Sequence, residues 1–162
     1  MDQRFSLKGK RALVTGASSG LGAHFARVLA ASGADVALAG RRVQACEKTA
    51  QEIAATGGKA IPVAMDVGSR TSVEQAIAET VAALGGLDII INNAGIAGTA
   101  ALLNETEEEW DRIIDTNLKG AFLVAQAAAK AMKERGGSII NIASVLGLRI
   151  MGHVGAYATS KA

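Results

Sequence analysis

Two residues near the carboxyl terminus could do acid–base chemistry together. Tyr157 and Lys161 lie in the stretch GAYATSKA, four residues apart, which places two side chains on one face of a helix. A free phenol has a pKa of about 10, so it is a poor proton donor or acceptor at neutral pH. Lowering the pKa of such a phenol to about 7 takes about 4 kcal/mol of preferential phenolate stabilisation. A nearby ammonium in a site shielded from water could supply much of it. Taken alone, such a pair far more often belongs to an ordinary solvent-exposed helix than to a catalytic site.

A glycine-rich turn precedes this pair by more than a hundred residues. TGASSGLG, residues 15–22, follows the apolar run RALVT and opens an amphipathic stretch. Glycines between a strand and a helix let the backbone approach a pyrophosphate, whose charge is favoured at the helix N-terminus. The usual dinucleotide pattern G-x-G-x-x-G is not met, because Ser18 takes the middle position. A purely structural turn therefore stays open as an alternative.

The end of the second apolar run bears on the choice of cofactor. A site that selects NAD usually places Asp or Glu there, where the carboxylate holds the ribose 2′-hydroxyl. This chain has Gly40 at that position, followed by Arg41 and Arg42. We expect Gly40 to leave room and Arg41 to pair with a 2′-phosphate, with Arg42 as a second cation. The alternative is a solvated helix start, but positive charge opposes the helix dipole there. The sequence favours NADP(H) over NAD(H).

The elements that must position these groups alternate along the chain. Apolar runs at 11–15, 35–39, 59–64, 87–91 and 138–143 predict strands that are buried on both faces. Helical periodicity is expected at 20–32, 42–56, 70–84, in a pair of segments near 106–115, and at 117–135. This order predicts an α/β fold, a doubly wound parallel sheet with helices on both faces. With the glycine-rich turn after the first strand, we expect a single Rossmann-like NAD(P)-binding domain spanning 1–162. Glycines at 33, 57–58, 85–86 and 136–137 are typical helix ends, and Thr106 with Glu109 resembles a capping box.

Composition limits the kind of partner. Lys and Arg number 17 against 15 Asp and Glu, so charge gives no case for binding nucleic acid or an anionic membrane. The single cysteine, Cys46, excludes an intrachain disulfide and suits a reducing compartment. The amino terminus lacks the apolar core of a signal peptide, and no apolar run is long enough to span a bilayer. We expect a cytoplasmic protein, and we assign no residue to a metal.

Five motifs together resemble the classical short-chain dehydrogenase/reductase family. TGASSGLG resembles its nucleotide turn, NNAG at 92–95 its fourth-strand motif, and TNLKG its Asn-bearing helix start. NIAS at 141–144 resembles its catalytic serine strand, and YATSK its Tyr-x-x-x-Lys pair. The motifs run from residue 15 to 161 in the family's order and spacing. Each alone has an ordinary structural explanation, such as a helix cap for Ser144 or Asn117, but their joint order indicates the family.

The resemblance implies a role for each matching residue. The catalytic tetrad would be Asn117, Ser144, Tyr157 and Lys161, with Ser144 bonding the substrate oxygen, Asn117 holding a water, and Lys161 also reaching the nicotinamide ribose. Asp66 and Val67 would lie against the adenine. The remaining cofactor contacts would be made by Gly16, Ser18, Ser19, Gly20, Leu21, Gly22, Asn93, Ala94 and Gly95, beside Tyr157 and Lys161 themselves.

The resulting hypotheses differ in what the chain does. The leading one is an NADP(H)-dependent oxidoreductase that transfers a hydride between nicotinamide and a ketone or secondary alcohol. The family's helix after the tyrosine is long, and nothing in GAYATSKA ends a helix, so we expect a fragment or incomplete record that lacks the carboxyl-terminal substrate-binding part. The alternatives are a cofactor-binding fragment without turnover and, less favoured by the glycine spacing, a sugar-nucleotide epimerase or dehydratase. The family also implies a homodimer or homotetramer at full length, paired partly through the Ala-rich helix AFLVAQAAAKAM.

Overall fold

The computed structural model describes residues 5–149 and 151–162 and contains one five-stranded sheet. The strands lie in the order β3-β2-β1-β4-β5, and every neighbouring pair is parallel. The elements follow one another as β1 (Arg11–Thr15), α1 (Gly20–Ala31), β2 (Asp35–Gly40), α2 (Val43–Ala55), β3 (Ala60–Ala64), α3 (Arg70–Leu84), β4 (Ile89–Asn92), α4 (Glu107–Ile114), a π-helical turn (Asp115–Lys119), α5 (Gly120–Met132), β5 (Ser138–Asn141) and α6 (Gly155–Lys161). Short 3-10 turns lie at Leu102–Asn104 and Val145–Gly147.

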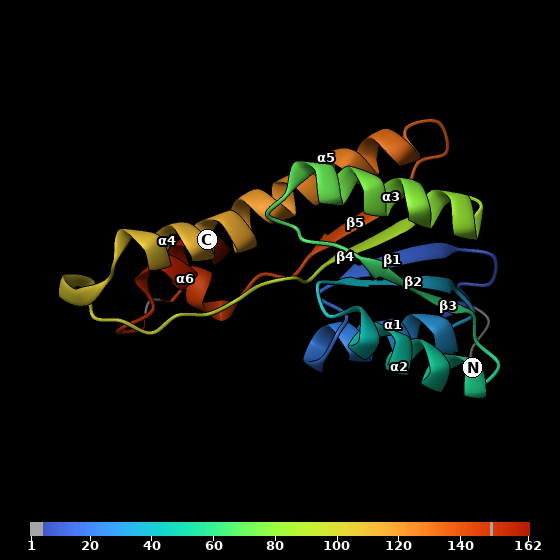
Figure 1. Ribbon diagram of the computed structural model, residues 1–162, viewed down its shortest axis with the longest axis horizontal. Coiled ribbons are helices and arrows are strands. Elements are labelled where there is room, and N and C mark those ends of the chain that lie inside the picture. The colour runs from blue at the N-terminus through green and yellow to red at the C-terminus, as the bar shows by residue number, and fades with distance from the viewer. Residues whose placement is uncertain (1–4, 150) are drawn as a thin grey trace.

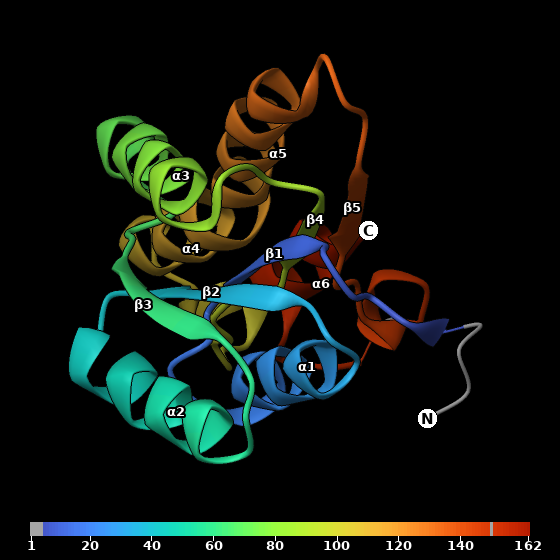
Figure 2. The same cartoon turned by 90° about the vertical axis from the view of Figure 1, so that its right-hand side faces the viewer.

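Helices cover the two faces of the sheet in pairs, as the sequence predicted. α1 and α2 lie on one face, and α3 and α5 on the other (Figure 1; Figure 2, turned by 90°). Successive residues of β1 supply the two cores: Ala12 and Val14 pack under α1 and α2, while Leu13 packs under α3 and α5. β1 and β2 are buried on both faces, so they are apolar almost throughout instead of alternating. The prediction of burial on both faces is wrong for β5, whose residues are mostly exposed, Ile140 to 47%, because β5 is an edge strand of the sheet. The predicted doubly wound α/β fold is confirmed.

Helix ends follow local signals in the sequence. At α3, Ser69 accepts a hydrogen bond from the Ser72 amide, and Gly85 ends the helix in the left-handed conformation with φ of 78°. These bounds, 70–84, are the predicted ones. At α4, Thr106 accepts from the Glu109 amide as expected, but the Glu109 carboxylate binds Arg112 instead of completing the capping box.

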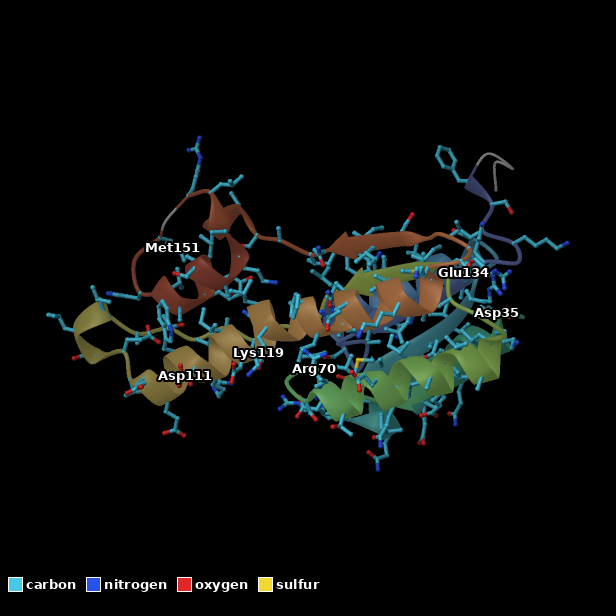
Figure 3. All side chains as sticks on the ribbon, turned by 90° about the horizontal axis from the view of Figure 1, so that it is seen from above. Asp35, Arg70, Asp111, Lys119, Glu134 and Met151 are labelled. Carbon is cyan, nitrogen blue, oxygen red and sulfur yellow. The ribbon has the colours of Figure 1, made fainter. Side chains whose placement is uncertain are left out.

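The segment predicted as one helix over 117–135 has a different beginning. α4, the π-helical turn and α5 form a long rod that reaches past the sheet (Figure 1). Figure 3 shows the rod from above, with Asp111 on α4, Lys119 in the π-helical turn and Glu134 beyond α5. Hydrophobic periodicity carries no signal for a π turn, so the sequence could not place this interruption. Within the described residues, no helix has the length and apolarity to cross a membrane.

An ion pair joins the start of β1 to the residue before β4, at the edge opposite the glycine-rich turn. The Arg11 guanidinium donates to both Asp88 carboxylate oxygens at 2.7 and 2.8 Å, and the Arg11 amide donates at 2.8 Å. Both side chains are 13% exposed. These bonds hold the pKa of Asp88 below its ordinary value.

We predict that Asp88→Asn lowers the free energy of unfolding by about 3 kcal/mol at neutral pH, since it leaves a largely buried guanidinium without its counter-charge. Because the folded-state pKa of Asp88 is depressed, its stabilisation exists above the ordinary carboxyl pKa and is lost as pH falls through the folded-state value. The deficit of the variant should therefore shrink in acid. Urea unfolding at neutral and acidic pH measures it.

Glu52→Gln is the matched control, because Glu52 pairs with Arg27 across two exposed side chains. We expect that change to cost less than about 1 kcal/mol. If both variants lost the same free energy of unfolding, the Arg11–Asp88 pair would stabilise the fold no more than an exposed ion pair does.

Candidate active site

A cavity of about 400 Å³ opens at the carboxyl edge of the sheet. The strand order reverses between β1 and β4, and open α/β sheets bind their ligands outside such a point. Nine of the predicted cofactor residues line this cavity: Gly16, Ser18, Ser19, Arg41, Arg42, Asp66, Val67, Ala94 and Gly95. Met65, Ile96 and Thr116, which the sequence did not single out, also line it.

The glycine-rich turn packs against the loop after β4 with no room for side chains. A Cβ added at Gly16 would lie 2.9 Å from the Ala94 Cα, and one at Gly22 would meet the Gly16 carbonyl oxygen and lie 2.7 Å from Asn93 Nδ2. α1 begins directly after Ser19, which lines the cavity. Its first three residues are Gly20, Leu21, which is 61% exposed, and Gly22. The first amides of a helix have no partners within it, so this edge suits an anion.

Thr15 ties the turn to the loop after β4. Its hydroxyl is fully buried and accepts hydrogen bonds from the amides of Asn93 and Ala94 at 3.0 and 2.9 Å. The Asn93 side chain donates back to the Thr15 carbonyl at 2.9 Å. Thr15 was not among the predicted site residues, although it is the first residue of the TGASSGLG motif. The sequence feature that could have indicated it is a hydroxyl residue directly after the apolar residues of β1.

Asn92 fixes the neighbouring strand in a similar way. Its side chain is buried and donates to the Ala121 carbonyl at 2.7 Å and to the Asn141 side chain at 3.1 Å. These bonds join β4 to α5 and to β5. Together with Asn93, Asn92 makes NNAG a brace between the sheet and its helices.

The two arginines after β2 lie differently. Arg42 donates to the Ser18 and Ser19 hydroxyls at 3.0 and 2.9 Å, so its guanidinium lies over the glycine-rich turn. Arg41 is exposed and lines the cavity. A Cβ at Gly40 would come no closer than 3.5 Å to Cys46 Sγ, which is ordinary contact. Cys46 is buried, and burial raises the pKa of its thiol.

The π-helical turn brings Asn117 into the protein. Its side chain is 4% exposed; Oδ1 accepts from the Ile96 amide at 2.8 Å, while Nδ2 donates to the Ile96 carbonyl at 2.8 Å and to Ser160 Oγ at 3.0 Å. An extra residue in a helical turn rotates the side chains that follow, and π turns are frequent at functional sites. Asn117 thus connects the rod to the cavity wall and to α6.

Lys161 lies at the end of α6, half-buried. Its Nζ donates to the Ile142 carbonyl at 2.8 Å, and burial lowers the pKa of its amine. A Cβ at Gly95 would lie 3.3 Å from Asn117 Oδ1 and 3.6 Å from Lys161 Nζ, so both polar atoms lie close to this residue of the cavity wall. Asn117, Lys161 and Asn92 also line a second cavity of about 290 Å³ beside α5.

The other two predicted tetrad residues come from neighbouring segments. Tyr157 is half-buried on α6, one helical turn before Lys161. Ser144 follows β5, and its hydroxyl accepts from the Leu146 amide at 3.2 Å, which caps the 3-10 turn. The tetrad residues thus come from the π-helical turn, the segment after β5 and α6. Among the residues with described placement, no group of three or more His, Cys, Asp or Glu side chains could hold a metal.

The fold and its edge define a class: a Rossmann-like sheet with a glycine-rich turn at the point where the strand order reverses. The family model described as short chain dehydrogenase matches residues 10–162, and the chain belongs to that family.

Individual relatives are similar over most of this chain. It is 39% identical over 158 residues to a sorbitol dehydrogenase of Cereibacter sphaeroides, covering 96% of this chain and 60% of that protein. It is 42% identical over 141 residues to a 3-oxoacyl-acyl-carrier-protein reductase of Staphylococcus aureus, covering 85% and 57%. The crystal structure of a short-chain type dehydrogenase/reductase from Mycobacterium marinum matches with a TM-score of 0.93 at 46% identity, covering 97% and 63%. The chain thus spans about 60% of the length of the curated relatives it matches.

We predict that Thr15→Val, which keeps the side-chain shape, lowers the free energy of unfolding by about 2 kcal/mol, because two partly buried amides lose their acceptor. Urea unfolding measures the loss, and hydrogen exchange at Asn93 and Ala94 should quicken. Thr49→Val is the matched control, since the buried Thr49 hydroxyl donates only weakly, at 3.4 Å, to a carbonyl of its own helix. If the control variant lost as much stability, the tie between the loops would have no role.

Proposed function

We propose that this chain carries the cofactor site and the reactive groups of an NADP(H)-dependent oxidoreductase, which transfers a hydride between nicotinamide and a ketone or secondary alcohol. The observation that carries the proposal is the cavity of about 400 Å³ at the carboxyl edge. Residues from TGASSGLG, from the arginine pair, from the third strand's end and from NNAG all line it, although they lie up to 79 residues apart in sequence, from Gly16 to Gly95. Asn117 Oδ1 and Lys161 Nζ lie close to Gly95, a residue of the cavity wall.

The residues present fit a dinucleotide. The missing side chains at Gly16 and Gly22 leave the turn closely packed, with Ser18 and Ser19 at the cavity surface to meet a pyrophosphate. We assign Asp66 and Val67, which line the cavity at the end of the third strand, to the adenine. Arg41 and Arg42 put two cations beside Gly40, where a carboxylate would otherwise repel a 2′-phosphate. This arrangement favours NADP(H).

The bound cofactor supplies or accepts the hydride, and the protein's own groups manage the proton. As a carbonyl is reduced, negative charge grows on its oxygen, and we assign the Tyr157 hydroxyl as the proton donor to that oxygen. The Ser144 hydroxyl donates a second hydrogen bond to it, which stabilises the developing charge. The Lys161 ammonium stabilises the phenolate left behind, and Asn117 holds the water from which the proton is replaced. In alcohol oxidation the proton would move the other way, from the alcohol oxygen to the Tyr157 phenolate.

The substrate is proposed only as a class. The curated relatives are named for a polyol and for an acyl thioester, which share only a carbinol or carbonyl carbon as the reacting centre. We propose a ketone or secondary alcohol on that ground. Partly exposed Leu118 and Phe122 on the rod favour pairing of the whole protein into a homodimer or homotetramer.

We predict that Tyr157→Phe lowers kcat for NADPH-dependent reduction of a diketone by about 10²- to 10⁴-fold, because the proton donor is lost. The dissociation constant of NADPH should change less than about twofold, since the ring remains. Stopped-flow turnover and calorimetric binding measure the two. Undiminished turnover in the variant would refute the proposed role. A wild-type chain that binds NADPH but reduces no carbonyl would instead be a nucleotide-binding module.

A second prediction concerns the 2′-phosphate. Arg41→Ala should weaken NADPH binding by about 10- to 100-fold and NADH binding much less, because only NADPH offers a dianion to the guanidinium. Arg27→Ala removes the same charge from α1, where Arg27 pairs with Glu52 outside the cavity, and should change neither affinity. Equal losses of NADPH and NADH affinity in the Arg41 variant would remove the assignment.

A further inference from the structure

Ser160 lies between the two reactive residues of α6 and has a hydroxyl in an unusual position. The residue is 6% exposed, one position before Lys161. Its Oγ donates to the Tyr157 carbonyl at 2.7 Å and accepts from Asn117 Nδ2 at 3.0 Å. Serines in helices often bond a carbonyl of the preceding turn, which accounts for the first bond. The second bond crosses to another element.

That second bond completes the hydrogen bonding of the Asn117 amide group. One Nδ2 proton goes to the Ile96 carbonyl and the other to Ser160, while Oδ1 accepts from the Ile96 amide. An amide nitrogen has two protons, so both are used. Without the Ser160 hydroxyl, one proton would lose its protein acceptor in a buried bond, which is costly. The amide would be expected to turn or shift to find one.

The bonds run in sequence across three segments. They lead from the Tyr157 carbonyl through Ser160 and Asn117 to Ile96, which lines the nucleotide cavity. The segments are α6, the π-helical turn and the loop after β4. The bonds that link them here involve the side chains of Ser160 and Asn117 and are not β-sheet hydrogen bonds. Their relative positions decide how far the phenol lies from the nicotinamide side of the cavity.

We propose that Ser160 is a positioning residue for the reaction assigned above: its hydroxyl holds the Asn117 amide and sets α6 against the wall of the nucleotide cavity. The inference rests on the proposed function. It adds a residue to the site whose effect on the reaction passes through Asn117, and which does not itself meet the substrate.

The bond itself can be tested without turnover. In ¹⁵N-labelled chain, nuclear magnetic resonance follows the two side-chain amide protons of Asn117, and we expect both to exchange slowly with solvent. In Ser160→Ala one of them should exchange at least about tenfold faster, because its acceptor is gone. Thr159→Ala, which removes an exposed hydroxyl from the same helix, should change neither. Unchanged exchange of both protons in Ser160→Ala would overturn the proposal.

The consequence for the reaction is tested by a double-mutant cycle. Ser160→Ala should lower kcat by about fivefold to tenfold, with the KM for NADPH changed less than about twofold, and should add little in an Asn117→Ala background, because both changes remove one linked unit. Ser160→Thr, which keeps the hydroxyl, should recover much of the loss. Independent, multiplying losses would show that Ser160 acts only on helix stability and would overturn the proposal.

The two arms separate the possible failures. A wild-type chain with no NADPH-dependent turnover would refute the proposed function, while slow exchange of both Asn117 protons would still establish the Ser160 bond. Normal turnover together with an unchanged Asn117 amide in Ser160→Ala would leave the function standing and overturn the role of Ser160.

Discussion

The buried hydroxyl of Thr15 fixes the point on which the whole site depends. β1 and β4 are neighbours in the sheet, and the chain leaves them toward opposite sides, so their loops must part at the carboxyl edge. Two loop amides that become buried there need an acceptor, and Thr15 supplies one oxygen for both. The loop after β4 is therefore held against the glycine-rich turn. Glycine at positions 16 and 22 follows from that close approach as much as from any ligand.

Sequence patterns predicted the layers of this fold because its signals are local. Strands buried on both faces are apolar throughout, and β1 occupies the predicted residues 11–15. α3 has a serine at its start and a glycine at its end, and its bounds were also predicted. The bounds of β4 differ by one or two residues from the predicted 87–91, because burial of Leu87 extends the apolar run beyond the hydrogen-bonded strand. Burial of a residue and its hydrogen bonding in a sheet are different properties, and an apolar run in the sequence indicates only burial.

The sequence predicted cavity residues only where they belong to a short motif beside a strand end. The nine predicted residues that share the cavity come from short motifs next to strand ends, and parallel strands bring those ends to one edge. Contacts between motifs were not predictable. Nothing in AGRR indicates that Arg42, and not Arg41, bonds the serines of the turn. Likewise, no pattern in the sequence indicates that Asn117, which lies in the π-helical turn, bonds both Ser160 and Ile96.

The placement of Lys161 shows why these contacts matter for the chemistry. Taking an ammonium out of water costs free energy, which is why burial lowers the pKa of this amine. The Ile142 carbonyl offsets part of the cost by accepting a hydrogen bond, but a carbonyl carries only a partial charge. A full negative charge nearby would raise the pKa again. In the reaction proposed above, the Tyr157 phenolate one helical turn away would be that charge, and the partial burial of Lys161 would strengthen its attraction for such an anion. That coupling weakens steeply with distance, so it requires α6 to be held firmly against the sheet edge.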